Sequence, residues 1–222
     1  MTEPLDALDA ETERTAAFLD GLGPGDWGRP TRCPPLNLRE LAVHTLRGAY
    51  RITDTLAAPR LDGEPEKDAI TYWAYDRQAV GAGVVSRARH ESGERPPDAD
   101  IAAEWRRKWS EASAAARAAA ADDPLIPALP GTIRLREFIK TRLIEVGVHT
   151  MDLRDAVGLA PDRSPEGLEC LGDVLGGILG ADLRPMGVDD VRFALAGTGR
   201  ATLTEEERAM LGPLADRFPL LQ

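Results

Sequence analysis

One stretch of the chain, residues 132–157, places apolar side chains three or four residues apart along its whole length. The apolar positions are Leu135, Phe138, Ile139, Leu143, Val146, Leu153 and Val157. This spacing brings the side chains to one face of an α-helix, and Gly158 follows where a glycine commonly ends a helix. The stretch therefore predicts a long helix with one buried face, which limits the fold to architectures that can cover such a face.

Four earlier segments show the same helical spacing and are separated by loops rich in proline and glycine. They cover residues 4–20, 37–57, 68–90 and 99–122. Asn37, with Glu40 three residues later, has the pattern of a capping box at the start of the second segment. Gly81 and Gly83 weaken the third segment, since a glycine costs about 1 kcal/mol relative to alanine inside a helix. Long helices joined by modest loops favour a four-helix bundle.

The last part of the chain has a different pattern. Residues 165–180 predict a helix softened by several glycines, and residues 191–196 alternate in the manner of a short strand. Thr204, followed by three glutamates, predicts the start of one more short helix. We therefore expect a mainly α fold, with a helical bundle over residues 1–160 and a small α/β appendage over residues 161–222.

The charge of the chain argues against several classes of partner. The formal net charge is −10, and an acidic chain repels phosphate backbones and anionic lipid. No apolar run approaches the roughly 18 residues of a membrane-spanning helix, and the first residues lack the apolar core of a signal peptide. We therefore expect a cytoplasmic protein without nucleic-acid or membrane partners, in which Cys33 and Cys170 are reduced structural thiols.

Glu145 and His149 lie four residues apart on the strongest predicted helix, so their side chains share one face, one turn apart. Arg142 and Asp152 extend the same strip, and the four fall within an arc of roughly 80° at the border of the apolar face. A polar strip beside a core is costly unless something satisfies it, and a divalent metal bound by carboxylate and imidazole would do so. The alternative is a surface pair that adds only about 0.2–0.5 kcal/mol.

The other two histidines have different settings. His44 lies inside the predicted helix of residues 37–57, and Gly48 one turn later leaves room for a ligand or a neighbouring backbone. Helical spacing by itself favours a hydrogen-bonded core histidine at this position over a metal ligand. His90 precedes an exposed loop, and we expect it to be solvated.

Three segments resemble the signatures of a known family. Residues 27–44, WGRPTRCPPLNLRELAVH, are similar to W-x-x-P-T-x-C-P-G-W-[ST]-[VL]-R-[DE]-L-x-x-H. Residues 145–153, EVGVHTMDL, are similar to E-x-x-x-H-x-x-D-L, and residues 193–212 are similar to the C-terminal end of one branch. Together they resemble the mycothiol-dependent maleylpyruvate isomerase family, which lies within the DinB-like superfamily of metal-binding four-helix bundles.

The resemblance implies that His44, Glu145 and His149 are the ligands of one divalent metal, usually zinc. Three protein ligands leave a position open for water or a thiolate, as catalytic zinc requires. The resemblance also implies mycothiol as the thiol cosubstrate. Where the family pattern has Gly-Trp, this chain has Pro35 and Leu36, so we expect a pocket that is widened or reshaped near the metal.

On this basis we expect an enzyme that uses a low-molecular-weight thiol for transfer to, or isomerisation of, an electrophilic small molecule. Asp152 is a candidate to orient His149 or to take part in proton transfer, with a salt bridge to an arginine of its own helix as the alternative. Arg47, Arg51 and Arg142 are candidates to hold carboxylate groups of the thiol or the substrate.

Two other classes of function stay open at the level of sequence. A non-catalytic DinB-like domain would bind a metal or ligand for regulation or sequestration. A structural helical protein would carry only a vestigial metal site. No apolar stripe predicts a dimer, so a monomer and a homodimer are both compatible with the sequence.

Overall fold

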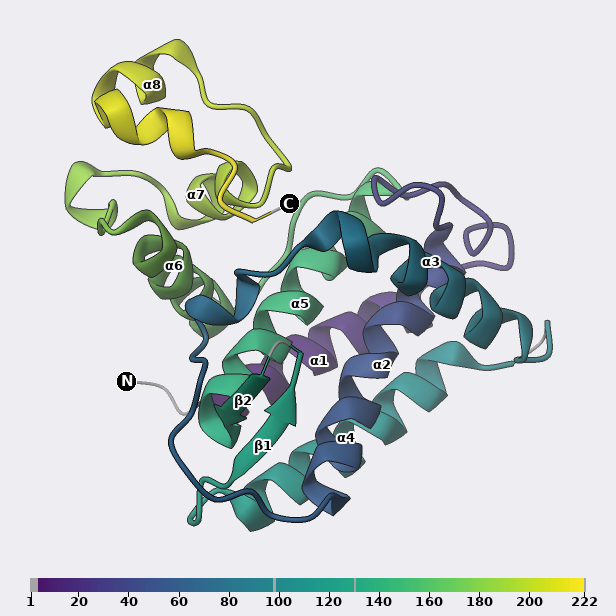
Figure 1. Ribbon diagram of the computed structural model, residues 1–222. Coiled ribbons are helices and arrows are strands. Elements are labelled where there is room, and N and C mark those ends of the chain that lie inside the picture. Colours follow the sequence, from purple (N-terminus) through teal and green to yellow (C-terminus); the bar gives the residue numbers. More distant parts are fainter. Residues whose placement is uncertain (1–3, 98, 130, 222) are drawn as a thin grey trace.

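A computed structural model describes residues 4–97, 99–129 and 131–221 of the 222-residue chain. Four helices form its bundle: α1 (Pro4–Asp20), α2 (Leu38–Ala57), α4 (Ile101–Ala119) and α5 (Leu135–Asp155). Helices α1 and α2 each pack against both α4 and α5 (Figure 1). The mainly α fold predicted from helical spacing is therefore confirmed. None of the described helices has the length and apolar composition needed to cross a membrane.

The core of the bundle is built from the apolar faces that the spacing predicted. Leu41 of α2 and Phe138 and Leu143 of α5 are fully buried. Trp105 of α4 is equally buried, and its indole N–H donates a hydrogen bond of 3.1 Å to the backbone carbonyl of Thr12 in α1. Since burying one large apolar side chain contributes about 1.5–3 kcal/mol, these contacts make the bundle a firm support for side chains at its edge.

Helix α2 begins where the capping pattern predicted. The side chain of Asn37 accepts a hydrogen bond of 2.9 Å from the backbone N–H of Glu40. The carboxylate of Glu40 in turn accepts one of 2.9 Å from the backbone N–H of Asn37. This capping box fixes the first turn of the helix that carries His44 less than two turns later.

A two-stranded antiparallel sheet, β1 (Leu125–Ala128) and β2 (Gly131–Arg134), precedes α5. The sequence predicted a helix from residue 132, so α5 begins three residues later than expected. Leu125 and Ile133 are buried beneath the hairpin, and Gly131 has a φ of 96°, which residues with a side chain rarely adopt. The small β part of this fold therefore lies before α5, and not in the C-terminal region.

The helix predicted over residues 68–90 is only partly confirmed. Helix α3 spans Arg77–Gly93, whereas the residues before it form the single 3₁₀ turn η1 (Thr71–Trp73). Asp68 gives the reason, because its carboxylate accepts hydrogen bonds of 3.0 and 2.7 Å from the backbone N–H groups two and three residues later. Such local bonds compete with a continuing helix. Helix α3 packs against α2 at one side of the bundle (Figure 1).

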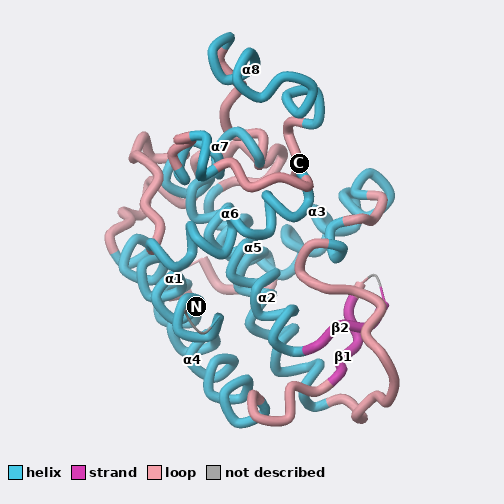
Figure 2. The backbone as a smooth tube through the Cα atoms, turned by 90° about the vertical axis from the view of Figure 1, so that its left-hand side faces the viewer, coloured by secondary structure: helices cyan, strands magenta, loops and turns pink. Residues whose placement is uncertain are grey.

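The C-terminal region gathers beyond one end of the bundle (Figures 1 and 2). Its elements are α6 (Pro165–Leu179), η2 (Arg184–Met186), α7 (Asp190–Gly197), α8 (Glu205–Leu211) and η3 (Gly212–Arg217). The strand predicted over residues 191–196 is wrong, since these residues lie in α7. The side chain of Asp189 accepts a hydrogen bond of 2.9 Å from the backbone N–H of Arg192, which starts a helix. The helix predicted after Thr204 is confirmed as α8, with Thr204 and Glu207 forming its capping box.

The C-terminal helices share α5 with the bundle. Ile144 and Val148 of α5 belong to a second apolar cluster, together with side chains of α6, α7, α8 and η3. A buried ion pair adds a second link, because Glu11 of α1 lies 3.2 Å from the guanidinium of Arg163, just before α6. The division of the chain into two domains near residue 160 stays a prediction. The shared apolar cluster and the buried ion pair both cross that boundary.

Candidate metal centre

His44, Glu145 and His149 lie together on the facing sides of α2 and α5. His44 Nε2 is 3.6 Å from Glu145 Oε1, and the side chains of both residues are 19% exposed. The rings of His44 and His149 lie edge to face, with their centroids 5.3 Å apart. Helical spacing in the sequence places only Glu145 and His149 together. The fold brings His44 of α2 beside them.

One pair of donor atoms and one pair of rings in this group have spacings close to those of ligands on a tetrahedral metal ion. Two donor atoms on one tetrahedral zinc lie roughly 3.3 Å apart, and two imidazoles on it have ring centres roughly 5 Å apart. The 3.6 Å between His44 and Glu145 and the 5.3 Å between the two rings are close to these values. Two imidazoles and a carboxylate are also an established ligand set for catalytic zinc.

Asp152 controls which nitrogen of His149 faces this group. Its Oδ2 lies 3.0 Å from His149 Nδ1, and the carboxyl group has no exposed surface. Arg200, which follows α7, donates two hydrogen bonds to Asp152, at 3.0 Å to Oδ1 and 2.6 Å to Oδ2. An ionised carboxylate can only accept, so Nδ1 keeps its hydrogen and Nε2 is the nitrogen that gives up its proton to a metal.

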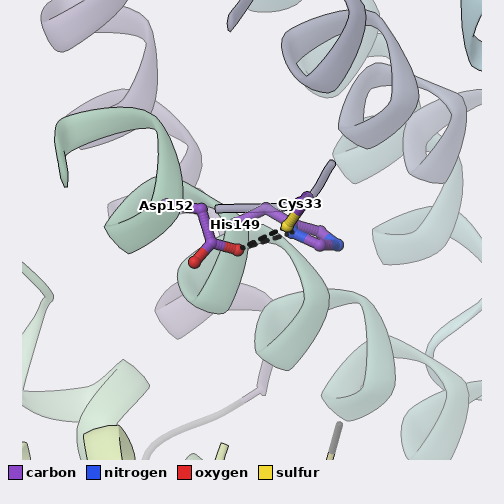
Figure 3. Close-up of side chains that lie close together, drawn as sticks. All are labelled: Cys33, His149 and Asp152. Atoms are coloured by element: carbon purple, nitrogen blue, oxygen red, sulfur yellow. Dashed lines mark hydrogen bonds and ion pairs between the residues drawn. The ribbon is translucent and has the colours of Figure 1, made fainter. Parts of the chain in front are cut away.

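Cys33 adds a thiol on the far side of the His149 ring. Its Sγ donates a hydrogen bond of 3.2 Å to Asp152 Oδ2 and lies 3.9 Å from His149 Nδ1 (Figure 3). Among the described residues, Cys33, His149 and Asp152 form a group whose three donor atoms all lie within 4.8 Å of one another, a criterion that His44, Glu145 and His149 do not meet. Two ligand sets therefore meet at His149, one through each ring nitrogen.

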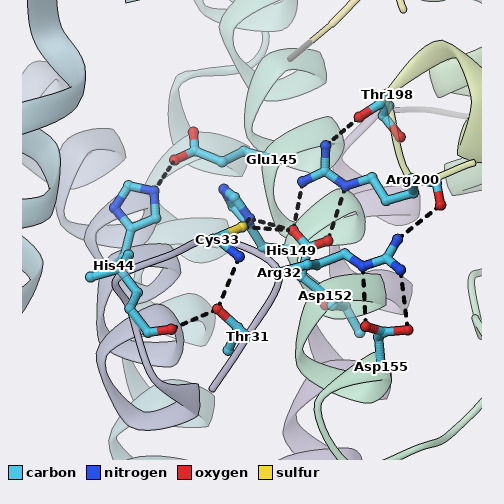
Figure 4. Close-up of polar contacts among 12 residues, drawn as sticks. Thr31, Arg32, Cys33, His44, Glu145, His149, Asp152, Asp155, Thr198 and Arg200 are labelled. Carbon is cyan, nitrogen blue, oxygen red and sulfur yellow. Dashed lines mark hydrogen bonds and ion pairs between the residues drawn. The ribbon is translucent and has the colours of Figure 1, made fainter. Parts of the chain in front are cut away.

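Arg200 gives a physical reason to prefer the set of His44, Glu145 and His149. Both oxygens of Asp152 already accept hydrogen bonds from the guanidinium of Arg200, so a cation bound there would lie beside a fixed positive charge. On the side of His149 that faces His44, Arg142 pairs with Oε2 of Glu145, whereas Oε1 faces His44 Nε2 at 3.6 Å and stays available to an ion. Figure 4 shows the two sides of the ring together.

The loop before α2 and the segment after α7 meet beside this group. Arg32 donates a hydrogen bond of 2.9 Å to the backbone carbonyl of Arg200, and its guanidinium lies 3.1 Å from Asp155 of α5 (Figure 4). No sequence pattern predicts a role for Arg200, and the sequence predicts only a structural thiol at Cys33. Both cysteines of the chain are free, as predicted.

Arg142, predicted as a ligand-binding residue, lines the cavity and also has partners within the protein. Its guanidinium is buried, forms an ion pair with Glu145 and donates a hydrogen bond of 2.9 Å to the hydroxyl of Tyr72. Its Nε donates another, of 3.1 Å, to the hydroxyl of Thr141. All three nitrogens therefore have partners, and Arg142 holds the Glu145 carboxylate in place.

A cavity of about 220 Å³ opens onto His44, Glu145 and His149. Helices α2, α3 and α5 line it together with η1 and the segment after α7. Arg47 and Arg51 are among the lining residues, as expected of residues that contact a ligand.

Leu36 is 5% exposed and packs in the apolar core, outside the cavity wall. Leu36 is therefore not among the residues that line the cavity, and no contact of its side chain supports the expectation that the missing Gly-Trp reshapes the pocket.

Burial and neighbouring charges move the pKa values of the two histidines in opposite directions. Burial, together with the nearby His149, lowers the pKa of His44 to about 4. Burial would also lower the pKa of His149, but hydrogen bonds to Asp152 and Cys33 outweigh it and raise the pKa to about 9. Burial would raise the pKa of Glu145, but the charge of Arg142 keeps it below its usual range.

Comparison with known families gives one match. The model of the mycothiol maleylpyruvate isomerase N-terminal domain matches residues 8–154, about two thirds of the chain, and spans His44, Glu145 and His149. Neither a curated protein nor a solved structure matches significantly.

Proposed function

Because the chain belongs to the family of mycothiol maleylpyruvate isomerase N-terminal domains, we propose that it is a metal-dependent enzyme acting with a low-molecular-weight thiol of the mycothiol type. It transfers the thiol to an electrophilic small molecule or isomerises that molecule through the thiol. The observation that carries this proposal is the grouping of His44, Glu145 and His149 at the wall of a cavity, with 3.6 Å between His44 Nε2 and Glu145 Oε1 and 5.3 Å between the two imidazole rings.

His44, Glu145 and His149 hold the metal in this proposal, and zinc suits their donor set best. A bound divalent ion lowers the pKa of a coordinated thiol, so that the thiol reacts as its thiolate near neutral pH. The chain's own contribution is to bring the three donors to the wall of one cavity before any ligand arrives. Arg142 does this for Glu145 through the ion pair between them.

Asp152 acts in this proposal as a positioning residue. It has no exposed surface, and its two oxygens face His149, Cys33 and Arg200 instead of the cavity. It therefore fixes the tautomer and the ring plane of His149, and Arg200 keeps its carboxyl group ionised. The arginine that pairs with Asp152 comes from the C-terminal segment and not from its own helix, in contrast to the alternative expected from sequence.

Arg47 and Arg51 are the predicted ligand-binding residues that remain available to a bound molecule. Both line the cavity, and both come from the helix that carries His44. The closest carboxylates to Arg47 are those of Asp54 and Glu91, at 3.8 and 4.0 Å, which are long contacts for ion pairs. We propose that Arg47 and Arg51 contact polar groups of the thiol or of its electrophilic partner.

Metal analysis of purified protein that has not met a chelator tests this proposal. Wild type should carry one equivalent of metal, and His149→Ala should carry far less. His90→Ala is the matched control, since the side chain of His90 is 73% exposed and pairs only with Glu94. Unchanged metal content in His149→Ala would overturn the site.

The chemistry is tested by consumption of mycothiol in the presence of a panel of electrophiles. Wild type should consume the thiol faster than protein lacking the metal, and His149→Ala should match the metal-free protein. Full metal content without any consumption would favour a binding or sequestering role over an enzyme.

A further inference from the structure

Two parallel rows of side chains on α5 line the cavity beside the metal group. Glu145 and His149 form the first row, four residues apart. Ile144 and Val148 form the second row, also four residues apart, and each directly precedes a proposed metal ligand. Successive residues of a helix differ in direction by about 100°, so the second row is turned towards the C-terminal region, where both side chains join the second apolar cluster. The cavity therefore extends from the metal group across α5 to an apolar wall.

Leu221 and Trp73 complete this apolar wall. Leu221 belongs to the same apolar cluster, and its backbone N–H donates a hydrogen bond of 2.8 Å to the carbonyl of Gly197, the last residue of α7. Trp73 of η1 packs against both this cluster and the core of the bundle. Together with Ile144 and Val148, both side chains line the cavity. The wall is thus built jointly by α5, η1 and the C-terminal region.

The chemistry of this wall limits what can lie against it. The side chains of Ile144, Val148 and Leu221 offer no hydrogen-bond donor or acceptor, so a polar group placed there loses its water without replacement. An apolar group leaves water favourably, and most of the gain comes from its own surface. A low-molecular-weight thiol is polar apart from its sulfur, and its body is therefore poorly suited to the wall. The apolar wall suits the electrophile instead.

We propose that Ile144, Val148 and Leu221 form a subsite for an apolar group of the electrophile, such as an alkyl chain or an aromatic ring. The subsite rests on the proposed function, because the metal group defines where the reactive end of the molecule lies. It selects electrophiles whose carbon skeleton continues from the reactive carbon without charged or hydrogen-bonding groups on the side of the C-terminal region.

Calorimetric titration of the zinc-loaded protein with acetohydroxamate and butyrohydroxamate tests the subsite. Both molecules ligate zinc through the same hydroxamate group, and their alkyl chains differ by two methylenes. Wild type should bind butyrohydroxamate roughly fifteenfold more tightly, since each buried methylene raises affinity about fourfold. The heat-capacity change of binding should also be more negative for the longer chain, which is the mark of apolar burial.

Val148→Thr nearly keeps the shape of the side chain and adds a hydroxyl group to the wall. It should keep the wild-type zinc content and affinity for acetohydroxamate, but its preference for butyrohydroxamate should fall to about threefold or less. Leu221→Asn, which changes a residue outside the helices, should have the same effect. Val174→Thr is the matched control, since Val174 is 3% exposed in the same apolar cluster but lies on α6 and does not line the cavity. It should keep the wild-type preference.

Equal affinities of wild type for the two hydroxamates would overturn the subsite and leave the metal site intact. A wild-type preference in both Val148→Thr and Leu221→Asn, or an equal loss of preference in Val174→Thr, would also overturn it, because the alkyl chain would then lie elsewhere. Acetohydroxamate that binds metal-free and zinc-loaded protein alike would overturn the metal site of the proposed function, and the subsite with it.

Discussion

His149 offers one nitrogen to each of two groups, and the hydrogen on its ring separates them. Asp152 Oδ2 lies 3.0 Å from Nδ1 and can only accept, so Nδ1 keeps its hydrogen and Nε2 is the nitrogen that can bind a metal on the side of His44 and Glu145. A metal held by Cys33, His149 and Asp152 would need that hydrogen removed and would have to share Asp152 with Arg200. A difference of one proton therefore distinguishes the two possible metal centres.

The first prediction separates these ligand sets by cobalt substitution. Cys33→Ser should keep one equivalent of Co²⁺, and the wild-type cobalt spectrum should lack the intense near-ultraviolet band of a thiolate ligand. His44→Ala should lower metal affinity by at least about a hundredfold, since even residues that only orient a ligand are worth about 10–100-fold. A thiolate band in wild type that disappears in Cys33→Ser would contradict the assignment and favour the group containing Cys33.

Sequence reasoning reached these residues unequally. Glu145 and His149 share a helix, so their i, i+4 spacing alone places them on one face. His44 came from the family resemblance, because nothing in its own helix distinguishes a ligand from a core histidine. Arg200 lies 48 residues from Asp152 in the chain, and its position depends on how the C-terminal segment folds back. The spacing of residues within one helix cannot predict a contact between segments so far apart in the chain.

At the scale of elements, helix α5 has packing partners on several sides. It contacts α1 and α2 of the bundle and α6 of the C-terminal region. Gly147, between Glu145 and His149, faces the buried guanidinium of Arg163, so a Cβ at this position would overlap with that group. The absence of a side chain at residue 147 thus lets Arg163 approach the helix that carries the proposed metal ligands.

The second prediction compares two glycines in helices. Gly147→Ala should lower the free energy of unfolding by about 1–3 kcal/mol, because Arg163 must shift from its partner Glu11. Gly172→Ala in α6 should raise it by about 0.5–1 kcal/mol, since no atom lies within 4 Å of the added Cβ and alanine is the better helix former. Urea unfolding of both variants measures the two changes, and equal effects would contradict the packing described for Arg163.

The third prediction concerns the pH dependence of the contact between α7 and α8. The carboxylate of Glu207 accepts hydrogen bonds of 2.6 and 2.7 Å from Arg192 and one of 2.7 Å from the backbone of Thr204. The hydrogen bonds from Arg192 outweigh the effect of burial and lower the pKa of Glu207 from 4.5 to about 2. A lowered carboxyl pKa adds stability above pH 4.5 that is lost as the pH falls towards 2.

Glu207→Gln should therefore be less stable than wild type at pH 6, by roughly 0.5–1 kcal/mol, and the gap should close on acidification towards pH 2. Urea unfolding at a series of pH values measures this gap. Glu205→Gln is the matched control, since Glu205 is an exposed residue in the first turn of the same helix and does not pair with Arg192. A gap that stays constant, or that appears equally in the control, would contradict the assigned role of the ion pair.

Local capping explains where element prediction succeeded and where it failed. The capping boxes of α2 and α8 are visible as Asn37 with Glu40 and Thr204 with Glu207, and both helices begin as predicted. The side chains of residues 191–196 alternate in character as in a strand, but the cap at Asp189 starts a helix that includes them. That cap is readable in the sequence and outweighs an alternation of only six residues.

At the scale of the whole molecule, the proposed site depends on both parts of the chain. The metal ligands come from α2 and α5, whereas Arg200, which fixes Asp152, comes from the segment after α7. The second apolar cluster is continuous from Ile144 and Val148 of α5 into the C-terminal helices. The C-terminal region therefore completes the site, and we expect its stability to be coupled to that of the bundle.

The fourth prediction is that the chain unfolds as one cooperative unit. Breaking a buried ion pair by removing one partner typically costs about 3–5 kcal/mol, and the pair of Glu11 and Arg163 joins α1 to the start of α6. In hydrogen exchange measured along a urea series, peptides of α2 and α6 should share one midpoint in wild type. Glu11→Ala should lower both midpoints together, because loss of either part exposes the apolar face of α5.

Independent domains divided near residue 160 would behave differently. Peptides of α6 would then exchange at a lower urea concentration than peptides of α2, and Glu11→Ala would widen that difference. The matched control is Glu13→Ala, which removes a carboxylate from the exposed side of α1. Its effect on both midpoints should be within about 0.5 kcal/mol of zero, since surface ion pairs contribute little. A shift in Glu13→Ala as large as that in Glu11→Ala would show that the buried pair is not what couples the two parts.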